Sequence, residues 1–169
     1  DWPGVIFTHG LGAWWIPSSL YPWRLVDFGI MLAAVVASAR YLGRFSQRQA
    51  RLFLWAYPLL YVTSLGPWFA GQKDMVAAHF VMLAILPAHL HAGSGRRCWL
   101  LMAGSLVGLA ILHKPTVGAP LPVVGWVAAR ERAPNAARAI AGAEFGVGAG
   151  AVLTVFAGFG TIWLTGTPI

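Results

Sequence analysis

Residues 75–91 read MVAAHFVMLAILPAHLH, an apolar stretch that no Asp, Glu, Lys or Arg interrupts. A stretch of this length and hydropathy is typical of a helix that crosses a lipid bilayer. The whole chain favours the same class, because 58% of its residues are apolar, only 10% are charged and its mean hydropathy is +0.67. Such a chain has too little polar surface for a soluble globular domain. We therefore predict an all-α protein, a polytopic transmembrane helical bundle.

Further apolar stretches lie on both sides of this one, and we treat residues 1–169 as a single transmembrane domain. We predict about six spans, near residues 25–42, 50–68, 75–91, 98–112, 116–130 and 139–164. Residues 3–17 are apolar but short and broken by glycine and proline, so we expect a short interfacial helix at the outer face there. Because no Met and no basic leader precede these residues, we expect the N-terminal half of a longer protein.

The basic residues are distributed unevenly. Nine of the twelve Lys and Arg residues fall in three loops, at 40–51, 96–97 and 130–138. The positive-inside rule places these loops in the cytoplasm, so we predict a protein integral to the bacterial cytoplasmic membrane. The net charge of +7 is explained better by membrane lipids than by nucleic acid, because no basic helix or aromatic-interleaved patch is present. The single Cys98 excludes a disulfide within the chain.

Two of the expected spans, 98–112 and 116–130, are short. Each would cover about 22 Å of a hydrocarbon core that is about 30 Å thick. The polar turn His113-Lys114-Pro115 between them would then lie below the outer membrane surface. Irregular backbone is tolerated at that depth only where it is buried in protein or lines a water-filled cavity. The short spans therefore predict an aqueous pocket that opens to the outer side, with Lys114 at its floor.

The remaining charged residues on the outer side are the candidates for chemistry. Asp74 begins the span at 75, where the helix dipole favours a carboxylate, and Lys73 precedes it. Ionisable groups at membrane depth are usually functional, so we predict that Asp74 is an acid–base or metal carboxylate and Lys73 a phosphate-binding cation. Lys114 is a point charge suited to a phosphate, and the adjacent His113 is a candidate for contact with a sugar or a metal.

Arg24 lies three residues before Asp27, on the same face of a predicted helix. We expect these two side chains to neutralise each other, and the alternative is that Arg24 binds a substrate phosphate. The other histidines are scattered, and packing or interfacial roles are expected for them. No nucleophile elbow, phosphate-binding loop, zinc-ligand spacing or dinucleotide fingerprint occurs in the chain.

Four short motifs follow one another in a familiar order. They are Asp1-x-Pro-Gly-apolar at 1–5, Arg-Leu-Val-Asp at 24–27, Gly-Gln-Lys-Asp at 71–74 and Gly-Leu-Ala-x-x-x-Lys-Pro at 108–115. This order resembles the GT-C superfamily of polytopic membrane glycosyltransferases, and most closely its aminoarabinose transferases and protein mannosyltransferases. The resemblance implies an inverting transfer of a sugar from a polyprenyl-phosphate donor to a lipid, glycan or protein acceptor at the outer face of the membrane.

The resemblance also implies roles for individual residues. Asp1 matches a catalytic-loop acid before proline that can hold a divalent metal, Mg²⁺ or Mn²⁺, and Asp74 matches a second acidic position at the head of a span. Lys114 matches a basic residue near the donor phosphate. Trp2 stands where the relatives closest in chemistry often have Lys, and the usual catalytic base would lie upstream of Asp1.

Two other classes of protein stay open. A secondary transporter or channel would carry ionisable residues in the middle of its spans and broken helices in two corresponding halves. A non-catalytic membrane assembly subunit would use small residues for close helix packing, and Gly142, Gly146 and Gly150 have the required spacing.

Overall fold

The computed structural model describes residues 21–69, 73–118, 121–130 and 137–165, and within these ranges every regular element is a helix. The elements are α2 (Tyr21–Leu42), α3 (Gln47–Phe69), α4 (Lys73–Ser94), α5 (Arg97–His113), the 3₁₀ turn η1 (Pro115–Gly118), α6 (Leu121–Arg130) and α7 (Ala137–Thr165). The all-α prediction is confirmed. The interfacial helix expected at 3–17 lies outside the described residues.

Three of the described helices are long and apolar enough to cross a membrane, fewer than the six spans predicted from the sequence. Their apolar windows are Leu25–Leu42, Asp74–Ser94 and Ala139–Thr161. Helix α5 has 17 residues and α6 only 10. At about 1.5 Å per residue, α6 extends about 15 Å, or half of a hydrocarbon core. The span expected at 116–130 is therefore divided into a short turn and a short helix.

The outer faces of the long helices support lipid contact. Large apolar side chains are exposed along α2, α3 and α7, among them Leu25, Leu59, Trp55, Phe156 and Trp163. Soluble proteins rarely expose apolar surface on this scale, whereas a bilayer requires it. Length, hydropathy and exposed surface together indicate that the protein associates with a membrane through these helices.

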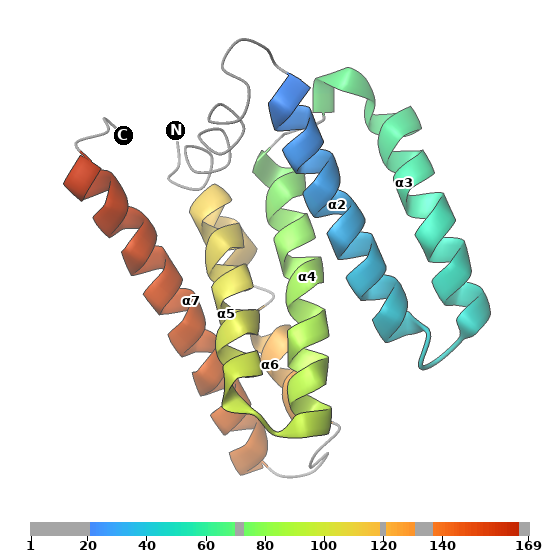
Figure 1. Cartoon of the computed structure of the whole chain (residues 1–169). Helices are drawn as coiled ribbons and strands as arrows, with labels where there is room; N and C mark the ends of the chain where they lie inside the picture. Colours follow the sequence, from blue (N-terminus) through green and yellow to red (C-terminus); the bar gives the residue numbers. More distant parts are fainter. Residues whose placement is uncertain (1–20, 70–72, 119–120, 131–136, 166–169) are drawn as a thin grey trace.

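The helices form a bundle with α4 and α5 side by side at its centre (Figure 1). Helix α7 packs against α5, α2 packs against α4, α3 lies outside α2, and α6 contacts α4 and α7. The α2–α3 connection with Arg44, and the α4–α5 connection with Arg96 followed by Arg97 at the start of α5, lie at one end of the bundle, called the basic end here (Figure 1). The start of α4 and the end of α5 lie at the opposite end.

Glycines allow α5 and α7 to approach closely. A Cβ atom added to Gly104 would overlap the Val147 carbonyl, and one added to Gly108 would lie 2.8 Å from a carbonyl oxygen of α7. On α7, Gly146 and Gly150 lie against α5, as the small-residue spacing predicts. Helices in lipid associate through such close packing because burial from lipid brings little hydrophobic gain.

Candidate functional site

Asp74 and Lys114 lie together at the end of the bundle opposite the basic end. The Lys114 Nζ atom donates a hydrogen bond of 2.5 Å to Asp74 Oδ2. The two residues are 40 positions apart in the chain, and each was singled out from its own sequence context. The Lys114 side chain is 38% exposed and the Asp74 side chain 48%, so the pair remains accessible to a ligand.

Local backbone preferences place both charges at this end. Asp74 occupies the first turn of α4, where the partial positive charge of the helix N-terminus favours a carboxylate. Lys114 is the C-cap of α5 and has φ −151° and ψ 108°. The helical region is disfavoured for a residue before proline, and Lys114 adopts the extended backbone that Pro115 favours, so α5 ends there.

His113 precedes this lysine but is buried, with 1% of its surface exposed. Its Nδ1 atom lies 2.8 Å from the Leu109 carbonyl oxygen, which can only accept, so Nδ1 carries the proton and donates. Its ring packs against Phe80 with the ring centroids 5.5 Å apart. The imidazole therefore ties the end of α5 to α4, while its predicted contact with a sugar or metal stays a prediction.

The other predicted site residues cannot be placed in the same way. Asp1 lies outside the described residues, as do the side chains of Arg24 and Lys73. Their predicted roles in catalysis, metal binding and substrate binding stay predictions.

The described part of the site offers little to a divalent cation. No group of three or more His, Cys, Asp or Glu side chains forms among the described residues. Asp74 supplies one carboxylate, whose Oδ2 already accepts from Lys114, whereas Mg²⁺ and Mn²⁺ take several oxygen ligands. The described residues by themselves do not form the predicted metal site.

A second set of polar side chains lies inside the bundle, and we call Asp27, Tyr57, Tyr61 and His79 the buried polar cluster. Tyr61 Oη donates a hydrogen bond of 2.6 Å to Asp27 Oδ2. Tyr57 Oη lies 3.2 Å from Nε2 of His79, whose ring also packs against Tyr61 at a centroid distance of 5.3 Å. The cluster therefore joins α2, α3 and α4.

Two members of this cluster, Asp27 and His79, lie within the apolar windows of α2 and α4. Asp27 and His79 are 1% and 0% exposed. Each lies six residues after the first residue of its helix, Tyr21 in α2 and Lys73 in α4, which is about 9 Å along the helix axis. His79 Nδ1 is buried and has no hydrogen-bond partner among the residues that the structure describes. Burial of polar groups is costly, so such groups inside a span usually serve a function.

Sequence reasoning missed this cluster. The sequence predicts only packing or interfacial roles for His79, and the predicted pairing of Asp27 with Arg24 stays a prediction because the Arg24 side chain lies outside the described residues. One available signal was the spacing of Tyr57 and Tyr61, which puts both hydroxyl groups on the same face of α3. The partners of those hydroxyls come from two other helices, and the sequence does not say which helices are neighbours.

Comparison with known proteins adds no assignment. No protein-family model matches the chain, and neither a curated protein nor a solved structure shows significant similarity to it. The function is therefore argued from the two groups of polar residues.

Proposed function

We propose that this chain is part of an integral membrane glycosyltransferase. It transfers a sugar from a polyprenyl-phosphate donor to a lipid, glycan or protein acceptor at the outer face of the bacterial cytoplasmic membrane. The observation that carries the proposal is the ion pair between Asp74 and Lys114. It joins the two residues that the sequence selects, separately, as a reactive carboxylate and a phosphate-binding cation.

The position of the pair suits a lipid-linked donor. The prenyl tail of such a donor lies in the hydrocarbon and its phosphate at the membrane surface. Asp74 stands at the first turn of a membrane-length helix, and Lys114 at the end of the shorter helix beside it. A cation at that level can hold the phosphate while the tail remains in lipid.

The pair also provides the two groups that the reaction needs. The acceptor oxygen forms a bond to the anomeric carbon as the bond from that carbon to the donor phosphate oxygen breaks. The Asp74 carboxylate accepts the proton of the acceptor hydroxyl, and the departing polyprenyl phosphate keeps the bonding electrons. Lys114 stabilises the negative charge that develops on this phosphate. A divalent cation, if bound through Asp1, would add charge stabilisation.

In the absence of a donor, Asp74 and Lys114 neutralise each other. An incoming phosphate competes for the ammonium group and releases the carboxylate beside the reacting carbon. The exchange is inexpensive, because an ion pair exposed to this extent is worth about 1 kcal/mol or less.

The test is transfer measured with a labelled polyprenyl-phosphate sugar in membranes that contain the complete protein. Asp74→Asn removes the proton acceptor and is expected to lower the rate by about 10²-fold or more. Lys114→Ala removes the phosphate contact and is expected to cost about as much. Thr116→Ala is the matched control, because Thr116 is exposed on η1 in the same region and lies outside the pair.

Rates near wild type in both Asp74→Asn and Lys114→Ala would overturn the proposal. The amount of folded protein, measured by gel filtration in detergent, separates loss of chemistry from loss of structure. Neither variant should unfold the bundle, because both side chains lie partly in solvent.

A second candidate function is favoured by the buried polar cluster. We infer a secondary transporter as the alternative, since buried ionisable groups within spans are typical of proton and ion pathways. Proton or substrate flux into proteoliposomes, lost in Asp27→Asn and without covalent transfer, would support this alternative. Sugar transfer that persists in Asp27→Asn and fails in Asp74→Asn would exclude it.

A further inference from the structure

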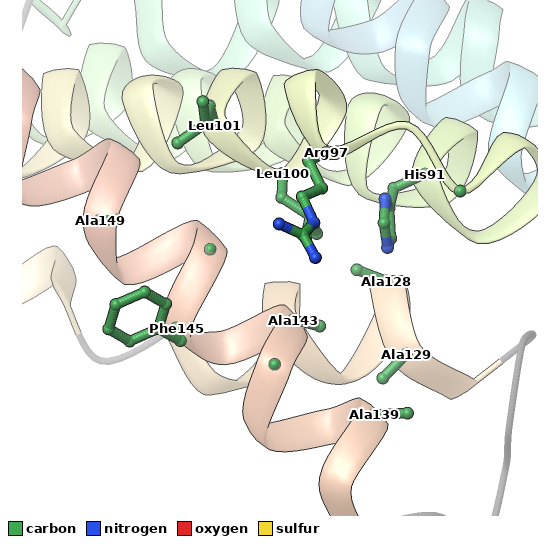
Figure 2. A pocket seen from close by; sticks show the side chains of 13 residues that line it. His91, Arg97, Leu100, Leu101, Ala128, Ala129, Ala139, Ala143, Phe145 and Ala149 are labelled. Carbon is green, nitrogen blue, oxygen red and sulfur yellow. The ribbon is translucent and has the colours of Figure 1, made fainter.

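A cavity of about 540 Å³ lies at the basic end of the bundle, away from Asp74 and Lys114. Its walls come from the end of α4, the start of α5, the last residues of α6 and the first half of α7 (Figure 2). Figure 2 shows the side chains of His91 and Arg97 pointing into the same space, toward α6 and α7. The site proposed above uses none of these residues.

His91 is the buried polar group of this cavity. Only 7% of its surface is exposed. Its Nδ1 atom lies 3.0 Å from the Arg96 carbonyl oxygen, so Nδ1 carries a proton and donates to that oxygen. The Nε2 atom has no hydrogen-bond partner among the described residues and faces the cavity (Figure 2). It can donate to an anion when the ring is protonated.

Arg97 and the start of α5 add positive charge beside this imidazole. Arg97 is exposed and lines the cavity, and its guanidinium group can bind two oxygens of a phosphate at once. The N-cap residue Arg96 forms no side-chain capping hydrogen bond. The first N–H groups of α5 therefore lack a side-chain acceptor, and such a helix N-terminus attracts anions.

The rest of the cavity wall is apolar. Alanine and glycine residues of α6 and α7 form its floor, and its large apolar side chains are Leu100, Leu101 and Phe145. Leu101 is 43% exposed and Phe145 is 79% exposed, as expected for side chains that meet lipid. An occupant thus meets the Arg97 guanidinium and the His91 imidazole at its polar end and hydrocarbon along its length.

We propose that this cavity binds the phosphate headgroup of an anionic phospholipid, with an acyl chain lying beside Leu101 and Phe145. A soluble phosphate could occupy the same cations but would gain nothing from the apolar wall. Basic pockets between transmembrane helices at the cytoplasmic side are common sites for anionic lipid headgroups. His91 and Arg97 thus form a specific lipid site, whereas the other arginines at the basic end attract anionic lipids without a defined site.

The test measures lipid retention by native mass spectrometry of the protein in detergent, with equal parts of phosphatidylglycerol and phosphatidylcholine added. Wild-type protein should retain phosphatidylglycerol selectively. Arg97→Gln should weaken this retention about tenfold, the usual cost of one charge-assisted hydrogen-bonding group. Arg96→Gln removes the same charge from the adjacent position, which does not line the cavity, and should bind within about twofold of wild type.

A second pair of variants tests the cavity itself without changing any charge. Gly142 lines the cavity and a Cβ atom there meets no described residue within 4 Å, so Gly142→Leu brings a side chain to the cavity with no clash at its Cβ atom. Gly148 has equally open surroundings and does not line the cavity. Selective retention should be lost in Gly142→Leu and kept in Gly148→Leu.

Equal losses in Arg96→Gln and Arg97→Gln would overturn the proposal, because they would indicate only general attraction between charges. Unchanged retention in Gly142→Leu would overturn it too. Displacement of phosphatidylglycerol by an equal concentration of inorganic phosphate would assign the cavity to a soluble anion instead of a lipid. None of these readouts depends on sugar transfer.

Discussion

Tyr61 on α3 donates a hydrogen bond of 2.6 Å to the carboxylate of Asp27 on α2, and both side chains are buried. A carboxylate taken out of water loses its hydration, and a hydrogen bond from a phenol restores part of that loss. Met31 and Val35 pack against the same tyrosine, so a polar contact and an apolar contact hold α3 to α2 together.

Tyr61→Phe should destabilise the protein. It removes the donor to a buried charged group and leaves the ring in place, so the expected loss is about 1.5–3 kcal/mol of unfolding free energy. The measurement is the midpoint of unfolding in detergent. Tyr41→Phe is the control, because Tyr41 is half-buried and makes ring contacts with Phe45 and His89 instead. Equal shifts in the two variants would contradict the prediction.

Exchange of the charges at positions 74 and 114 should separate structure from chemistry. The double variant Asp74→Lys with Lys114→Asp can rebuild an ion pair, and each single variant should cost about 1 kcal/mol or less of unfolding free energy. The double variant should therefore unfold within about 2 kcal/mol of wild type, since the exchanged charges oppose the dipoles of α4 and α5, but fail in sugar transfer because the carboxylate and the cation have changed places. Recovery of sugar transfer in the double variant would show that only the attraction between the two charges matters, and not which residue carries which charge.

Gly104→Ala should weaken the packing of α5 on α7. Its Cβ atom meets the Val147 backbone carbonyl, which cannot move aside without shifting the helix, and overpacking of this kind costs about 1–3 kcal/mol. Gly148→Ala has nothing within 4 Å of the new Cβ atom and should stabilise α7 by about 0.5–1 kcal/mol. Thermal unfolding in detergent compares the two, and a neutral Gly104→Ala would contradict the close approach.

The single cysteine makes the orientation of the bundle measurable. Cys98 is exposed near the start of α5, at the basic end. A membrane-impermeant maleimide added to intact cells should leave Cys98 unmodified and should label it in inverted membrane vesicles. In a Cys98→Ser background, Thr116→Cys should give the opposite pattern, because η1 lies at the other end of α5. The reverse result would place the basic end outside.

Much of the secondary structure could be predicted from local sequence. The run at 75–91 lies within α4, although it contains Pro87. The pair Lys114-Pro115 favours the end of α5, because the helical region is disfavoured for a residue before proline. The number of membrane spans, in contrast, could not be predicted from local sequence. An apolar window at 116–130 does not tell whether the chain stays helical throughout, and the break into η1 and α6 leaves a helix too short to cross.

The candidate site, too, has features that local sequence predicts and features that it does not. Sequence by itself determined that the chain is helical and suited to lipid, and that its basic residues are concentrated in a few loops. It also determined that Asp74 lies at the start of a helix and Lys114 at the end of one. Composition, hydropathy and turn chemistry are local properties, so they can be read without the tertiary structure. Only the tertiary structure decided that Lys114 meets Asp74 and that Asp27 meets Tyr61, and it alone placed His91 and Arg97 around one cavity. These pairings depend on which helices pack together and how closely. Glycines such as Gly104 allow the close packing, and the contacts that result join residues far apart in the chain.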